Sequence, residues 1–180
     1  NRGAVPGEQV VHKTVVDAIK KVEPEPLLII NTGDIVNSGI YIAPYGSEGI
    51  NDWQVFFDTT QPLLNHIAYY PAFGNHDVSG SGEDLFKVFA EYFPFYEDTA
   101  TYYSFDIGVV HFIILNSEID YDEGSPQYKW LKDDLISTAQ NPQIKFVISA
   151  FHGPPYSSGG HGSSIDIRGA FSPLFEAYKV

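Results

Sequence analysis

Three residues that can bind a metal ion or move a proton, Asn75, His76 and Asp77, follow Gly74 at the end of the apolar, aromatic run 67–73. A carboxamide oxygen can ligate a hard cation, an imidazole can donate a proton, and a carboxylate can fix the tautomer of an imidazole. A plain turn uses the glycine and accepts the asparagine, but it has no need of the histidine. The residue types therefore predict that this turn binds or reacts with a ligand.

Two further apolar runs end on residues with matching chemistry. Run 27–32 leads into Gly33-Asp34, and run 144–151 leads into His152. In an open α/β sheet ligands bind at the carboxyl ends of the strands, so three buried strands that end in this way predict one shared site. Each residue also has an ordinary interpretation. An isolated Asp34 can be a helix cap or a turn residue, and an isolated His152 fits a structural role about as well as a ligand role.

The remaining histidines have weaker contexts. His161 lies in the stretch 158–163, which is too polar and too rich in glycine for a core position. It is either a loop histidine without a task or a contact on the substrate side. The other three lie within helix or strand patterns without companion ligands, and we assign them to the surface or to packing: His12, His66 and His111.

Length and composition predict one globular domain over residues 1–180. With 43% apolar residues the chain can bury a core, and it holds no stretch long enough to span a bilayer, so we expect a soluble protein. With a net charge of -13 and scattered Lys and Arg residues, neither nucleic acid nor an anionic membrane surface is an obvious partner. The chain begins at Asn1 without a visible signal peptide. An extracytoplasmic location is therefore open, and neither compartment nor oligomeric state is indicated.

Charge and cysteine content also restrict the chemistry of the site. A negatively charged protein that handles a phosphate must supply positive charge locally, and metal ions do this most simply. The chain has no cysteine, which leaves only oxygen and nitrogen ligands for a metal. The candidate residues offer both donor types.

The apolar periodicity predicts an α/β fold in which helices and strands alternate, an order typical of crossover units in a mainly parallel sheet. Pro62 should end or bend the second helix near Thr60, and the loop 36–49 beside Asp34 is long enough to suggest a function. We expect two sheets with helices outside. The predicted helices cover 8–22, 50–64, 83–92, 126–139 and 169–178, and the predicted strands cover 27–32, 67–73, 101–107, 109–116 and 144–151.

The order of the three motifs resembles a known superfamily. Gly33-Asp34, then Gly-Asn-His-Asp at 74–77, then His-x-Pro-Pro-Tyr at 152–156, each after an apolar run, closely resemble the calcineurin-like metallophosphoesterases over roughly 27–180. The loop after His152 is most similar to the purple acid phosphatase branch and its bacterial relatives. The resemblance implies an α/β/β/α sandwich with two mixed sheets. It also implies hydrolysis of a small phosphoester, either a phosphomonoester or a phosphodiester.

The resemblance further implies a binuclear metal centre and a metal-bound hydroxide, with two divalent or trivalent ions drawn from Fe, Mn or Zn. Hydrolysis of phosphate esters needs up to about 10²¹-fold acceleration, and two metals can clamp both the attacking and the leaving oxygen. Asp34 would bridge the two metals, with Asn75 and His152 as ligands. His76 would face the substrate phosphate with Asp77 behind it, which makes these two the implied catalytic residues. His161 is the candidate on the substrate side.

Two features depart from the superfamily pattern. The superfamily normally begins with a strand that ends in an Asp motif and finishes with a Gly-His-x-His motif, and neither is present. We therefore expect an incomplete domain, cut at both ends, that lacks its first and last strands, one Asp ligand and two His ligands. The activity of such a fragment is left open. Asn37 stands where purple acid phosphatases carry a ligating tyrosine, so we expect no tyrosinate colour and leave the metal identity open.

The competing hypothesis is a catalytically inactive binding or structural module with the same fold. It is supported by the incomplete ligand set and by the aromatic residues Tyr41, Tyr45 and Trp53, which could hold a sugar or a partner. The residues encoded on either side discriminate the two hypotheses. An upstream Asp motif and a downstream Gly-His-x-His motif support the enzyme.

Overall fold

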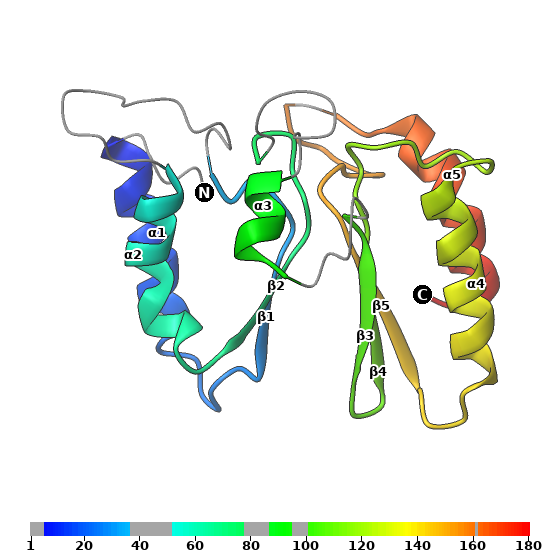
Figure 1. Ribbon diagram of the computed structural model, residues 1–180, viewed down its shortest axis with the longest axis horizontal. Helices are drawn as coiled ribbons and strands as arrows, with labels where there is room; N and C mark the ends of the chain where they lie inside the picture. The colour runs from blue at the N-terminus through cyan, green and yellow to red at the C-terminus, as the bar shows by residue number, and fades with distance from the viewer. Residues whose placement is uncertain (1–5, 37–51, 78–86, 95–100, 161) are drawn as a thin grey trace. The chain divides into compact units, whose positions relative to one another are not determined.

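The computed structural model describes residues 6–36, 52–77, 87–94, 101–160 and 162–180 (Figure 1). The chain separates into two compact units, Asn1–Pro94 and Phe95–Val180. The single domain expected over 1–180 therefore stays a prediction. Both units combine helices with a small sheet, in agreement with the predicted α/β class. No helix in the described ranges has both the length and the apolar character needed to cross a membrane.

The first unit contains a parallel pair of strands and three helices among its described residues. Strands β1 (Leu28–Asn31) and β2 (Ala68–Pro71) pair in parallel. Helices α1 (Pro6–Ile19) and α2 (Asp52–Leu64) lie side by side (Figure 1). The short helix α3 (Lys87–Tyr92) follows β2 in the chain.

Buried apolar side chains pack the three helices against one another and against the strands of the first unit. Val16 on α1 and Leu63 on α2 are buried with Ile67, which precedes β2. Trp53 on α2 packs against Phe89 of α3 with ring centroids 6.0 Å apart, and both side chains are buried. Burial of an apolar side chain of this size contributes about 1.5–3 kcal/mol, so these contacts fix the helices next to the strands.

The parallel pairing brings two loops to one edge of the sheet. Asn31 lies opposite Pro71 in the register. The Ala72 N–H donates to the Asn31 carbonyl at 2.7 Å, which extends the pairing by one residue. The chain therefore leaves both strands at the same edge, with segment 33–34 after β1 and segment 74–77 after β2.

The second unit is a three-stranded sheet with two helices. Strands β3 (Tyr103–Ile107) and β4 (Val110–Ile114) form an antiparallel hairpin, and β5 (Phe146–Ala150) pairs in parallel with β4, so the order is β3-β4-β5. Helices α4 (Pro126–Gln140) and α5 (Ile165–Tyr178) lie together on one face of this mixed sheet (Figure 1). The core beneath them consists of buried apolar side chains: Ile113, Leu115, Leu131, Leu135, Ile167, Phe171 and Leu174.

The last helix begins earlier than the sequence suggested. It starts at Ile165 and not at Gly169. Ser164 provides the cap, because its hydroxyl oxygen accepts the Ile167 N–H and so satisfies one of the free N–H groups of the first turn. The expected start at Gly169 was therefore wrong by one helical turn.

The second helix continues past its proline. It runs to Leu64, so Pro62 does not end it near Thr60, and the alternative, a bend at that point, stays a prediction. A proline inside a helix removes one backbone hydrogen bond. Leu63, in the same turn, is buried in the core, and its packing offsets that loss.

The strands that lead to the candidate site are less buried than expected. Strand β1 is only partly buried along its length, and in β5 Phe146 and Ile148 are 62% and 45% exposed. The intervening Val147 packs against the core under α4 and α5, as the alternation of side chains along a strand requires. Because β5 is an edge strand among the described strands of its sheet, its apolar composition did not imply burial on both faces.

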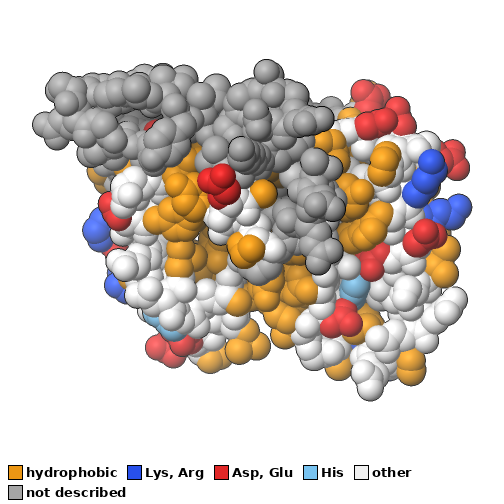
Figure 2. Space-filling view, in the orientation of Figure 1, with side chains coloured by type: hydrophobic (Ala, Val, Ile, Leu, Met, Phe, Trp, Pro, Cys, Tyr) orange, Lys and Arg blue, Asp and Glu red, His pale blue; other side chains and the backbone are white. Residues whose placement is uncertain are grey.

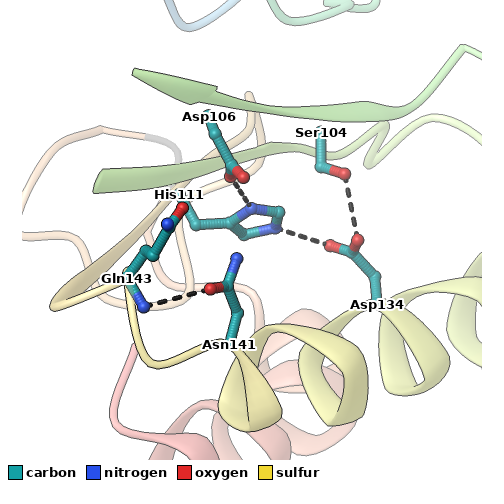
Figure 3. A network of polar contacts seen from close by, with 6 residues as sticks. All are labelled: Ser104, Asp106, His111, Asp134, Asn141 and Gln143. Carbon is teal, nitrogen blue, oxygen red and sulfur yellow. Dashed lines mark hydrogen bonds and ion pairs between the residues drawn. The ribbon is translucent and has the colours of Figure 1, made fainter. Parts of the chain in front are cut away.

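A buried histidine joins the hairpin to α4 (Figure 3). The His111 Nδ1 lies 2.6 Å from Asp106 Oδ1 and its Nε2 lies 2.8 Å from Asp134 Oδ2. The Ser104 hydroxyl donates to the second oxygen of Asp134 at 3.0 Å. Burial lowers the pKa of His111, but the hydrogen bonds and charges of Asp134 and Asp106 outweigh it, and the pKa is raised. The assignment of His111 to packing missed both carboxylate partners.

Candidate metal centre

The first turn of the candidate site follows β1. The Asn31 side-chain oxygen accepts the Gly33 N–H at 2.8 Å, which starts a tight turn directly after the strand. Asp34 then adopts a left-handed backbone conformation with φ of 53°. This conformation is uncommon outside glycine and is tolerated best by Asn and Asp. Because such outliers concentrate at functional sites, the backbone supports the same conclusion as the residue types.

Each of the two turns carries a carboxylate that accepts backbone N–H groups from the other turn or from the residues directly after it. The Asp34 Oδ1 accepts the His76 N–H at 3.0 Å. In the opposite direction, the Asp77 Oδ1 accepts the N–H groups of Ile35 and Val36 at 2.8 and 3.1 Å. We call these three hydrogen bonds the carboxylate latch. The latch joins turns that are far apart in the sequence and holds Asp34 against the Gly-Asn-His-Asp turn.

Gly74 allows the two turns to approach so closely. Its N–H donates to the Asp77 Oδ2 at 3.0 Å. A Cβ atom at this position would lie 2.2 Å from the Asp34 backbone nitrogen and 2.7 Å from the Asp34 Oδ1. The nearest atom belongs to the backbone, so no change of rotamer could relieve the overlap. Only glycine, which has no Cβ atom, fits at position 74 in this contact.

The Asp77 carboxylate is enclosed by the protein. Asp77 is 0% exposed, and burial raises its pKa to about 7, while the backbone N–H groups act against the increase and the charge of Asp34 adds to it. The family resemblance implied that Asp77 stands behind the His76 ring, which stays a prediction. In the structure the hydrogen bonds of its carboxylate go to three backbone N–H groups.

The third candidate strand end, after β5, is fixed by contacts within the second unit. His152 follows β5 by two residues and is half-buried. The next residue, Gly153, donates its N–H to the Ser117 Oγ at 2.9 Å. A Cβ atom on Gly153 would lie 2.4 Å from Ile167 Cδ1 and 3.2 Å from Ser117 Cβ. This close packing fixes the backbone from which the His152 imidazole projects.

The structure brings together the predicted residues of the first unit. Asp34 and segment 75–77 share the edge after β1 and β2. His152 belongs to the second unit, so its place in the same site stays a prediction. Within the described residues, no group of three or more His, Cys, Asp or Glu side chains is arranged to hold a metal ion. The predictions on Asn37, Tyr41, Tyr45 and His161 lie outside the described residues.

The donor types suit a hard or borderline metal ion. Asp34 offers carboxylate oxygen, Asn75 carboxamide oxygen and His152 imidazole nitrogen, which are ligand types for Mn, Fe and Zn ions. Asn75 is exposed, and Asp34 and His152 are half-buried, so none of the three is enclosed in a core. The residues present therefore fit the metal ions that the resemblance implies.

An open hollow in the second unit has the wrong charge for a phosphate site. It is bounded by Tyr121, Tyr128 and the first part of α5, together with four acidic side chains. An anionic phosphoester would be repelled by such a lining. The strand ends therefore remain the candidate site. The four acids are Asp120, Asp122, Glu123 and Asp166.

The chain belongs to the calcineurin-like phosphoesterase family, whose model matches residues 10–180. Purple acid phosphatase 23 of Arabidopsis thaliana is 28% identical over 183 residues, and the match covers 88% of this chain and 40% of the relative. A nucleotide pyrophosphatase/phosphodiesterase of Hordeum vulgare is 27% identical over 157 residues, covering 76% of this chain and 42% of the relative. The chain thus spans less than half the length of these curated relatives.

Solved structures share the fold. A purple acid phosphatase, PPD1, from yellow lupin (Lupinus luteus) seeds matches with a TM-score of 0.70 at 22% identity, covering 97% of this chain and 32% of that one. GAP50, the anchor in the inner membrane complex of Plasmodium, matches with a TM-score of 0.71 at 15% identity, covering 99% of this chain and 60% of that one. These likenesses concern the fold alone, and together with the family match they confirm the predicted metallophosphoesterase fold class.

Proposed function

We propose that the full-length protein is a metal-dependent phosphoester hydrolase with its active site at the carboxyl ends of β1, β2 and β5. The observation that carries the proposal is the carboxylate latch, which places Asp34 against the Gly-Asn-His-Asp turn. The family match supports phosphoester chemistry. A latch of this kind at two strand ends favours a reaction site over a plain pair of turns.

Asp34, Asn75 and His152 are the residues that would hold the metal ions, with Asp34 as the bridge between two of them. When bound, two metal ions supply hydroxide near neutral pH and positive charge that offsets the charge of the phosphate. Oxygen and nitrogen donors without any cysteine favour Fe, Mn or Zn over ions that prefer sulfur ligands.

His76 has a different task from its neighbour Asn75. The His76 backbone N–H donates to the Asp34 Oδ1, and consecutive side chains in a turn point in different directions. One side chain can therefore bind a metal while the next faces the substrate. We assign to the His76 imidazole the contact with the phosphate or the leaving group, where it donates a proton to the departing oxygen. A positioned proton donor contributes about 10²- to 10⁴-fold to the rate.

The substrate in this proposal is a small phosphoester. The chain carries a net charge of -13. On the face shown in Figure 2, the basic side chains of the described residues lie among acidic ones within each unit and do not form a track there. A long polyanion needs such a track, whereas a small substrate needs positive charge only at its phosphate. Nitrophenyl mono- and diesters, compared side by side, distinguish phosphomonoesterase from phosphodiesterase activity.

Substitution of Asp34 and His76 tests the assignment. Asp34→Asn should reduce metal content, because the loss of a bridging charge weakens both metal sites. Its turnover should fall by more than the roughly 10²-fold that loss of an outer-shell partner causes. His76→Ala should lower turnover by about 10²- to 10⁴-fold with metal content nearly unchanged. Ser157→Ala, in the exposed loop after β5, is the control and should retain wild-type values.

Metal analysis and kinetics on the same samples can each reject the assignment. Near wild-type turnover and metal content in Asp34→Asn would reject the bridging role. Loss of metal from His76→Ala would show that the ligand and the proton donor of the turn have been exchanged. The competing hypothesis, a catalytically inactive binding or structural module, predicts that the wild-type protein hydrolyses no phosphoester with Fe, Mn or Zn.

A further inference from the structure

We propose that Asp77 is a positioning residue that sets the conformation of the Asp34 turn, and with it the metal affinity of the site, before any metal binds. The inference rests on the proposed function in one respect, namely that Asp34 is a metal ligand. Asp77 itself would touch neither metal nor substrate. Its effect would pass through the backbone that follows Asp34 and through the Gly74 N–H of its own turn.

Asp77 has the geometry of a connector. Its Oδ1 accepts the N–H groups of Ile35 and Val36, the two residues that follow Asp34 in the chain. One oxygen that accepts two successive N–H groups fixes the direction in which the chain leaves Asp34. The Oδ2 accepts the Gly74 N–H of its own turn at 3.0 Å. The carboxylate therefore fixes two backbone segments relative to one another.

Asp34 needs this support because of its backbone conformation. Its φ of 53° lies in a sparsely populated region for a residue with a side chain. Such conformations persist only where the surroundings determine them from several sides. Asp77 holds the residues after Asp34, and the Asn31 side chain holds Gly33 before it. The Asp34 carboxylate in turn accepts the His76 N–H, so its direction depends on both turns.

A carboxylate at position 77 can accept all three hydrogen bonds, and its amide counterpart cannot. Both carboxylate oxygens are acceptors, whereas asparagine has one oxygen and one NH₂ group. In Asp77→Asn the NH₂ group of the new side chain would point at a backbone N–H that is also a donor. No hydrogen bond could form there, and the position is enclosed from water. The substitution preserves size and shape, so it breaks the connection without creating a cavity.

The test is the Mn²⁺ affinity of the folded, full-length Asp77→Asn protein, measured by competition with a chelator. The Kd should rise by about 10- to 100-fold, the range found when a group that orients a ligand is lost. Turnover should fall at limiting Mn²⁺ and recover at saturating Mn²⁺. A group that itself transferred a proton would not be rescued in this way. Asp58→Asn is the matched control, since it removes the same charge from an exposed side chain of α2 that accepts from Gln54.

Amide hydrogen exchange in the metal-free wild-type protein keeps the inference testable if Asp77→Asn does not fold. The N–H groups of Ile35, Val36 and Gly74 should be protected before metal is added, because Asp77 already accepts them. If all three exchange freely until Mn²⁺ is present, the metal orders the turn and the inference is wrong.

Two outcomes separate this inference from the proposed function. An unchanged Kd in a folded Asp77→Asn protein overturns the positioning role, whatever happens to turnover. A wild-type protein that binds Mn²⁺ but hydrolyses no phosphoester rejects the hydrolase proposal, and the comparison of Kd values still decides the role of Asp77.

Discussion

Asp77 in the first unit and His111 in the second are both buried ionisable residues, and their surroundings satisfy them in opposite ways. The Asp77 carboxylate accepts hydrogen bonds from backbone N–H groups. The His111 ring lies between the carboxylates of Asp106 and Asp134 (Figure 3). The backbone N–H partners of Asp77 carry no charge that a substitution could remove, whereas the carboxylate partners of His111 do. The two buried groups therefore respond differently to substitution.

The difference concerns what each group holds in place. Asp77 fixes the path of two turns that carry candidate ligands, and small displacements there matter, because a misplacement of about 1 Å can reduce a rate 10²-fold. His111 fastens the β3–β4 hairpin to α4, a contact between whole elements. We therefore expect changes in the first region to affect chemistry most. Changes in the second region should affect stability most.

Gly74→Ala should have the largest effect. The added Cβ would overlap the Asp34 backbone, so the two turns must separate and the latch must open. Turnover should fall by at least about 10²-fold, and the free energy of unfolding should fall by about 1–3 kcal/mol, the usual range for overpacking. Kinetics and denaturant unfolding of the full-length protein measure both quantities.

The second unit offers a matched control for this substitution. Gly169 lies inside α5, and a Cβ atom there would meet nothing within 4 Å. Because glycine is the poorer helix former, Gly169→Ala should stabilise the protein by about 0.5–1 kcal/mol and leave turnover unchanged. If the two variants behaved alike, the close approach at Gly74 would not be important.

Much of the fold was predictable from the sequence. The helix expected over 126–139 is α4, Pro126–Gln140, and Ser125 provides the cap that a sequence can indicate. The start of α5 was missed because Gly169 was taken as its beginning, although Ser164 carried the capping signal. Burial of β5 was overestimated, since an apolar run does not reveal whether both faces of a strand are covered.

The approach of Asp34 to the Gly-Asn-His-Asp turn was predictable but its hydrogen bonds were not, and the place of His152 in the same site stays a prediction. The rule on strand ends indicated that Asp34 and the Gly-Asn-His-Asp turn meet, and the parallel register of β1 and β2 confirms this. The partners of Asp77 depend on contacts between residues far apart in the sequence, which no local pattern encodes. His111 has one partner that a local pattern indicates and one that it does not. Asp106 is its partner in the hairpin register, but Asp134 comes from a helix whose placement only the structure gives.

Removal of either carboxylate beside His111 should have an intermediate effect, and the two should differ. The Asp134 side chain is 18% exposed and accepts bonds from both His111 and Ser104, while the Asp106 side chain is 49% exposed. Solvent screens the more exposed pair. Asp134→Asn should therefore lower the free energy of unfolding by about 1–2 kcal/mol, and Asp106→Asn by less than about 1 kcal/mol. Equal losses in denaturant unfolding would contradict the assigned roles.

The smallest effect should be the pH dependence that His111 confers on stability. Its pKa is raised above the usual 6.5, so the folded protein binds this proton more tightly than the unfolded chain does. The stabilisation is therefore complete below the unfolded pKa and is lost as the pH rises through the folded pKa. The stability advantage of wild-type protein over His111→Gln should be larger at about pH 6 than at about pH 9.

The same measurement on a second histidine separates charge from packing. His66 pairs with Glu25 at 2.9 Å, but both side chains are exposed. Because solvent screens this pair, His66→Gln should change stability little at either pH. If the stability advantage of the wild-type protein over His111→Gln is the same at both pH values, His111 contributes by its packing alone. The contrast with the backbone-held Asp77 would then lose its electrostatic basis, since neither buried group would owe its stabilisation to a charged partner.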